Sequence, residues 1–122
     1  MRLIAAVVAA LLVAVFLALA VVTVADAACR TKECRQRVHM KRTVKPHRAW
    51  LNRVAACESG GNYRAVSPDG RYFGGLQFWP PSWRSVGGVG MPHHASPLEQ
   101  RYRAVLLLLR LQGPGAWPVC GR

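Results

Sequence analysis

The stretch that decides the fold is found at residues 54–62, Val54-Ala55-Ala56-Cys57-Glu58-Ser59-Gly60-Gly61-Asn62. Apolar side chains recur at helical spacing from Trp50 to Ala55, and the glycine pair predicts the C-terminal end of this helix. Glu58 is therefore expected in the last helical turn. The chain holds only five acidic residues against 17 Lys and Arg, so this carboxyl group is the first candidate for chemistry.

Glu58 is predicted to act as a general acid that cleaves a glycosidic bond. Protonating a glycosidic oxygen at neutral pH needs a carboxyl group whose charged form is disfavoured by poor solvation. The carbonyl dipoles at a helix C-terminus also favour the neutral form. The alternative is a helix-end ion pair with Arg53 or Arg64. Four aromatic residues are expected to supply the apolar walls of the site: Tyr72, Phe73, Phe78 and Trp79.

Turns and short elements are expected after the glycine pair. The sequence Ser-Pro-Asp-Gly at residues 67–70 predicts a turn, and Asp69 is a turn residue before it is a catalytic candidate. Residues 72–78 are expected to form a short strand or an irregular wall of a cleft. Residues 80–83 open a short helix, and residues 87–90 form a loop.

The last helix has the clearest boundaries. Ser96 is an N-cap, Pro97 suits the first helical position, Glu99 completes a capping box, and Gly113 ends the helix. Trp83 and Trp117 are expected in the core, since small cores rely on large aromatic side chains. The fold class is therefore mainly α (α+β), with minimal sheet. The stripe of the last helix expected to be buried is Leu98, Tyr102, Val105, Leu106 and Leu109.

The N-terminal region predicts export. An uncharged run from Leu3 to Ala25 follows Arg2, and Ala25-Asp26-Ala27 is compatible with cleavage after Ala27. Residues 1–27 are therefore a signal peptide, or a membrane anchor if they are not cleaved, because about 20 apolar residues span a bilayer. The expected location is secreted or at the cell wall.

Four cysteines in an exported chain predict disulfides, and three pairings are possible. We favour Cys29–Cys34, which are close in sequence, and Cys57–Cys120, which bracket the domain. The second closes a loop of about 64 residues, worth roughly 4 kcal/mol in the chain-entropy model. A zinc site is not expected, because the adjacent His93 and His94 are the only histidine pair with short spacing.

Residues 28–48 are predicted to be a mobile basic linker before a domain at residues 49–122. From Arg30 to Arg48 there are eight Lys or Arg and one acid, Glu33. This segment is either a solvated linker or a means of adhesion to anionic cell-wall polymers. Nucleic acid is not expected as a partner, since no aromatic residues alternate with the basic ones.

Four segments, residues 54–62, 72–78, 82–83 and 113–120, match a known family in their order and spacing. On these segments, residues 50–120 resemble the resuscitation-promoting-factor and transglycosylase-like domains of actinobacteria. The resemblance implies a lysozyme-like fold, cleavage of β-1,4 MurNAc–GlcNAc bonds in peptidoglycan, Glu58 as the catalytic acid, and the Cys57–Cys120 disulfide. It also implies glycan contacts by Ser82 and Gln112. Ser82 replaces the threonine usual in the family, and the turn at residues 67–70 is about one residue longer.

Three further residues are substrate-binding candidates. Gln77 either contacts sugar or satisfies the backbone of the adjacent glycine turn, and both interpretations stay open. Tyr63 and Trp79 lie beside polar turn residues and are candidates for stacking on sugar rings.

A second catalytic carboxylate is not evident. Ordinary glycosidases use two carboxylates, but only Asp69 and Glu99 remain in the domain, and Glu99 is assigned to a helix cap. A single acid is enough for a lytic transglycosylase, because the sugar's own C6 hydroxyl acts as the nucleophile. A hydrolytic muramidase is the alternative enzyme.

The alternatives from other classes are a non-catalytic wall-binding or signalling module and a membrane-active cationic protein. No cofactor is expected. The expected partners of a monomer are peptidoglycan glycan strands and anionic wall polymers, with other wall hydrolases as candidates.

Overall fold

The computed structural model describes residues 29–122, so the predicted signal peptide or anchor lies outside the described residues. Between Cys29 and Arg122 no helix is both long and apolar enough to cross a bilayer. The described elements, in chain order, are α2 (Lys32–Val44), η1 (Lys45–His47), α3 (Arg48–Ser59), α4 (Pro80–Ser85), η2 (Pro92–His94) and α5 (Pro97–Arg110).

The segment predicted as a mobile linker is helical over most of its length. Lys, Arg, Glu and Gln are good helix formers, and α2 contains no Gly or Pro. Thr31 Oγ1 accepts a hydrogen bond from Cys34 N at 3.1 Å, as an N-cap does. The predicted Cys29–Cys34 disulfide is present.

The compact unit that contains the site begins before the predicted boundary at Ala49. The chain divides into two compact units between Arg37 and Val38, and Val44 belongs to the hydrophobic core. The assignment of separate roles to residues 1–27, 28–48 and 49–122 stays a prediction.

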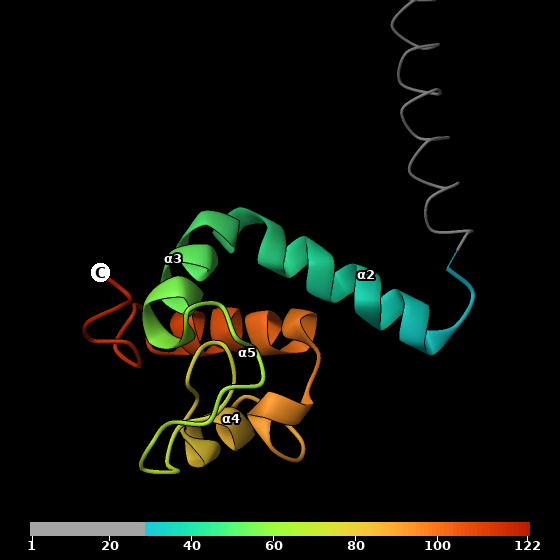
Figure 1. Ribbon diagram of the computed structural model, residues 1–122. Coiled ribbons are helices and arrows are strands. Elements are labelled where there is room, and N and C mark those ends of the chain that lie inside the picture. The colour runs from blue at the N-terminus through green and yellow to red at the C-terminus, as the bar shows by residue number, and fades with distance from the viewer. Residues whose placement is uncertain (1–28) are drawn as a thin grey trace, which may run out of the picture. The chain divides into compact units, whose positions relative to one another are not determined.

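In the unit that begins at Val38, α5 is the central helix (Figure 1). The ribbon shows α3 and the end of α2 on one side of α5, and α4 with the loops before it on the other side. The C-terminal loop lies beside α3, to which the predicted Cys57–Cys120 disulfide joins it. Three aromatic side chains pack edge to face in the core: Phe78, Trp83 and Trp117.

The mainly helical fold class is confirmed. Residues 72–78 form an irregular wall, and the only strand-like pairing in the part of the chain that the structure describes consists of the isolated bridges Val66–Phe73 and Phe73–Phe78. Gly60 ends α3 as predicted: its φ is 63°, and its N–H donates to Ala56 O at 3.0 Å.

The predicted stripe of α5 describes only half of its packing. Gln100, Ala104 and Leu107 are buried, and this face is offset from Leu98 and Tyr102 by two residues, about 200° around the helix. Leu98 and Tyr102 are partly buried against the other side of the core. Leu109 was predicted to be buried, which is wrong, since 57% of it is exposed. When a helix packs on both faces, no single apolar stripe in its sequence predicts which residues are buried.

Gln100 is the only buried polar side chain in residues 29–122. Its Oε1 accepts from Gly75 N at 2.9 Å, and its Nε2 donates to Tyr63 O at 2.9 Å and to Ala95 O at 3.0 Å. Ser59 Oγ donates to Gly75 O at 2.8 Å. The peptide groups at Gly75 are thus fixed from α5 on one side and from the end of α3 on the other.

Replacing Gln100 with Leu is expected to lower the free energy of unfolding by about 3 kcal/mol, because one buried and two partly buried backbone groups lose their partner. Urea unfolding measures this. Gln112→Ala, at an exposed position, is the control and should change stability by no more than about 0.5 kcal/mol. A loss below about 1 kcal/mol for Gln100→Leu would mean that the amide does not hold these segments.

Candidate active site

Glu58 lies in the last turn of α3, partly exposed. Burial raises the pKa of its carboxyl group above the ordinary value. Within residues 29–122 it forms no ion pair, either with Arg53 or with Arg64. The arrangement therefore favours the protonated carboxyl group, as a general acid requires.

Two adjoining cavities run away from Glu58. The first, of about 280 Å³, is lined by Glu58 and by the C-terminal loop. The second, of about 210 Å³, extends past Phe78, Trp79 and Ser82 to Leu107. We call the two together the groove, because they share four lining residues: Tyr72, Gln77, Ala116 and Trp117.

The groove has an aromatic lining. Tyr72 and Trp79 are 44% and 54% exposed, so both rings are available to a ligand. Trp117 is buried, as predicted for a core residue, and its Nε1 donates to Leu76 O at 2.7 Å. Trp117 therefore belongs both to the core and to the lining of the groove.

Gln77 bonds the backbone of the glycine turn and also lines the groove, so both interpretations left open by the sequence remain compatible with its position. It lines both cavities, and its Nε2 donates to Gly74 O at 2.9 Å. Its backbone adopts a positive φ of 49°, a strained conformation for a residue with a side chain. Among the described hydrogen bonds none uses Gln77 Oε1, which leaves this oxygen available to accept from a ligand hydroxyl.

Glu58 is the only acidic residue among the described groove-lining residues. Asp69 is an exposed turn residue that accepts from Ser67 Oγ at 2.6 Å and from Arg71 N at 3.2 Å. The hydrogen bond from Ser67 and then that from Arg71 lower the pKa of its carboxyl group.

Glu99 is occupied at the start of α5. Its N–H donates to Ser96 Oγ at 3.2 Å, and its carboxylate pairs with Arg103 at 3.2 Å. Ser96 is thus confirmed as the N-cap. The predicted capping box is incomplete, because the Glu99 side chain binds Arg103 and not the backbone N–H of Ser96.

No group of three or more His, Cys, Asp or Glu in residues 29–122 is placed to hold a metal ion. All four cysteines form the two disulfides.

Residues 45–120 match the family model described as the transglycosylase-like domain. The chain belongs to the transglycosylase-like domain family. Glu58, Ser82, Gln112 and the Cys57–Cys120 pair all lie within the matched residues, as does the whole groove.

Characterised relatives are resuscitation-promoting factors. The chain is 48% identical to resuscitation-promoting factor Rpf of Micrococcus luteus over 71 residues, which cover 58% of this chain and 31% of the relative. It is 52% identical to RpfC of Mycobacterium tuberculosis over 68 residues, 56% of this chain and 47% of the relative. For RpfD of Mycobacterium tuberculosis the identity is 49% over 67 residues, 55% and 42% of the two chains. The matched region thus spans less than half of each relative.

Two candidates taken from the sequence lie outside the lining of the groove. Tyr63 packs against the core, and its OH accepts from Arg101 Nε at 2.6 Å. Gln112 is exposed just after α5, with a φ of 53°. Ser82 and Trp79 line the groove as expected. The substrate contacts of all four residues stay predictions.

The walls supplied by the C-terminal loop were not singled out from the sequence. Ala116, Pro118 and Val119 line the cavity beside Glu58. The signal that could have identified them is the Cys57–Cys120 disulfide, since it brings the residues before Cys120 to the end of α3.

The raised pKa of Glu58 has a defined effect on stability. The folded state binds this proton more tightly than the unfolded state, so Glu58 should lower the free energy of unfolding as pH rises from its unfolded-state pKa through its folded-state pKa. Glu58→Gln should remove this loss, which urea unfolding from pH 3 to pH 8 can follow.

Asp69→Asn is the matched control. The folded-state pKa of Asp69 is lowered. Its contribution to the free energy of unfolding is therefore present above the unfolded-state pKa and is lost as pH falls, which is opposite to the pH dependence expected for Glu58. An NMR titration that gives Glu58 an ordinary or lowered pKa would contradict the assignment.

Proposed function

We propose that the protein is an exported lytic transglycosylase that cleaves the β-1,4 bonds between MurNAc and GlcNAc in peptidoglycan, with Glu58 as its single acid and base. The observation that carries the proposal is one partly buried carboxyl group with a raised pKa in a groove with no other acid among its described lining residues. Membership of the transglycosylase-like domain family supports the reaction class.

The first step is protonation of the glycosidic oxygen by Glu58. The bond from this oxygen to C1 of MurNAc breaks as the proton is transferred, and the GlcNAc side leaves as an alcohol. Positive charge develops at C1, next to the carboxylate that Glu58 has become. The raised pKa keeps a larger fraction of Glu58 protonated at a given pH than an ordinary carboxyl group would have, which is what a general acid requires.

The second step closes the sugar on itself. The C6 hydroxyl of the same MurNAc attacks C1, and the Glu58 carboxylate accepts the hydroxyl proton. The product is a 1,6-anhydro sugar, and Glu58 returns to its protonated form. An internal nucleophile needs no second carboxylate, in contrast to retaining and inverting hydrolases.

The groove supports binding of a polymer of sugars. Exposed aromatic faces at Tyr72 and Trp79 suit the apolar faces of pyranose rings. Oxygen and hydroxyl groups at Gln77 and Ser82 lie along the same lining. The two disulfides are typical of proteins in oxidising compartments, which supports export.

Glu58→Gln is expected to reduce wall cleavage by a factor of at least about 100, because general acid–base catalysis contributes about 100- to 10,000-fold. The assay is turbidity loss of purified peptidoglycan, with circular dichroism to verify folding. Asp69→Asn is the control, and it should retain activity because Asp69 lies in an exposed turn.

Mass analysis of the products separates the mechanisms. Products lighter by one water and resistant to borohydride reduction are expected for the transglycosylase. Reducing ends would indicate a hydrolytic muramidase. If the wild-type protein binds the wall but does not cleave it, the protein is a binding or signalling module.

A further inference from the structure

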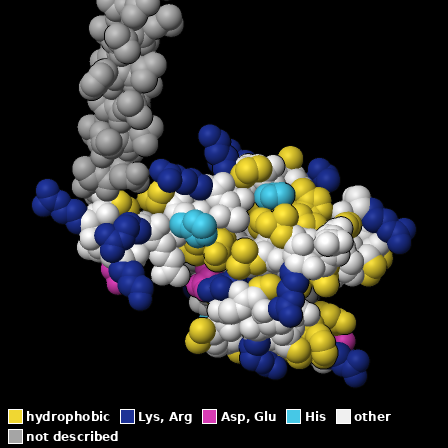
Figure 2. Space-filling view, turned by 180° about the vertical axis from the view of Figure 1, so that it is seen from behind, with side chains coloured by type: hydrophobic (Ala, Val, Ile, Leu, Met, Phe, Trp, Pro, Cys, Tyr) yellow, Lys and Arg dark blue, Asp and Glu magenta, His cyan; other side chains and the backbone are white. Residues whose placement is uncertain are grey.

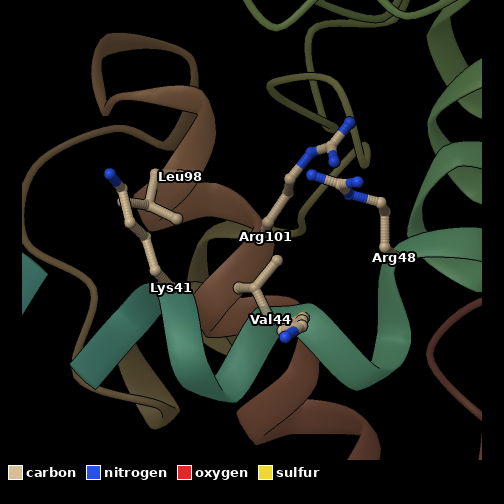
Figure 3. A pocket seen from close by; sticks show the side chains of 6 residues that line it. Lys41, Val44, Arg48, Leu98 and Arg101 are labelled. Atoms are coloured by element: carbon tan, nitrogen blue, oxygen red, sulfur yellow. The ribbon is translucent and has the colours of Figure 1, made fainter. Parts of the chain in front are cut away.

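A third cavity, of about 680 Å³, lies on the molecule outside the groove. Its lining has an apolar floor of Val44 and Leu98 and no acidic residue. Figure 3 shows side chains from the end of α2, the start of α3 and the first turns of α5 around it. Its four remaining lining residues are all cations: Lys41, Lys45, Arg48 and Arg101.

These cations have no carboxylate partner in the described part of the chain. Asp69 and Glu99 pair with other arginines, Arg71 and Arg103, and Glu58 lines the groove. Arg101 is held by neutral groups: its Nη2 donates to Asn52 Oδ1 at 2.9 Å and its Nε to Tyr63 OH. Like charges gathered without counter-charges repel, and an anion in the cavity offsets that cost.

The two guanidinium groups converge. In Figure 3 the side chains of Arg48 and Arg101 reach toward one another from α3 and α5. Guanidinium groups donate in a planar fork that matches phosphate oxygens. The non-bridging oxygens of a phosphate group carry enough lone pairs to accept from two guanidinium groups and from an ammonium group together.

The remaining cations extend the site beyond one phosphate. Lys41 lies in the last turn of α2, Lys45 begins η1 and Arg48 begins α3, so cations from three consecutive elements line the same cavity. Figure 2 shows that Lys and Arg also greatly exceed acidic side chains on the visible face of the described residues. Such an excess attracts polyanions over long range, and the cavity supplies a place for direct contact.

We propose that this cavity binds successive phosphate groups of a phosphodiester polymer, at a site separate from the groove. The cavity and the groove share no lining residue. Arg48 and Glu58 stand ten residues apart on α3, about 15 Å along the helix. The polymer can therefore occupy the cavity while a glycan strand occupies the groove.

The test compares two triple variants of the full chain with equal loss of charge. Lys41→Gln/Lys45→Gln/Arg48→Gln removes cavity cations whose side chains make no described hydrogen bond. Arg53→Gln/Arg84→Gln/Arg122→Gln is the matched control, outside all three cavities. The probe is poly(glycerol phosphate), with binding measured by calorimetry at several salt concentrations.

The cavity triple should weaken binding about 30-fold more than the control triple, and the slope of log Kd against log salt should fall by about 2. Equal weakening by both triples would overturn the site in favour of general charge attraction. Poly-L-glutamate of equal charge binding as tightly would overturn the preference for phosphate.

Two further arms separate the source of the phosphate and the proposed enzyme activity. The cavity triple should reduce the added affinity that phosphatidylglycerol gives to phosphatidylcholine vesicles no more than the control triple does. A larger reduction than the control's for vesicles, with none for the polymer, would assign the cavity to lipid. Glu58→Gln should bind poly(glycerol phosphate) like the wild type, so failure of this inference is distinguishable from failure of the proposed catalysis.

Discussion

The side-chain amide of Gln100 bonds three segments that are far apart in the sequence: the turn at Gly75, the carbonyl of Tyr63 and the approach to α5 at Ala95. The bond to Gly75 N satisfies a buried backbone group, and an unpaired buried group costs about 1–3 kcal/mol; the other two bonds satisfy partly buried carbonyls. Gly75 must also be a glycine, since a Cβ there would lie 2.7 Å from the Tyr63 ring. Because the described residues contain so little sheet, this amide links distant segments by hydrogen bonds, as strand pairing does in other folds.

The groove follows from that constraint. Gly75 is held by Gln100 from α5 and by Ser59 from α3, and Ser59 is the neighbour of Glu58. The wall at residues 72–78 therefore has a fixed place relative to the acid. The opposite wall is the C-terminal loop, joined to α3 by the Cys57–Cys120 disulfide and anchored by Trp117 on Leu76. A small domain thus positions both walls with few contacts, each of which crosses a long stretch of sequence.

The two ends of α3 carry different electrostatics. At its C-terminal end, burial raises the pKa of the Glu58 carboxyl group, whose neighbours in the cavity lining are uncharged. Near its N-terminal end, four cations gather around an apolar floor. This separation lets a strongly basic chain hold a carboxyl group whose pKa is raised, because none of the cations forms an ion pair with Glu58 in the described structure. An adjacent guanidinium group would instead stabilise the carboxylate and lower its pKa.

The local sequence determined the ends of α3 and α5, because Gly60 and Ser96 act through bonds to residues a few positions away. It also indicated Glu58, and the cysteine spacing favoured the pairing that is observed. Tertiary structure alone decided the rest. Gln100 carries no pattern that marks it as buried, and the two-sided packing of α5 hides its inner face. Arg101 and Arg48 line the same cavity only because the tertiary structure brings α5 near the start of α3. These outcomes depend on contacts between distant segments, whose energies no local pattern records.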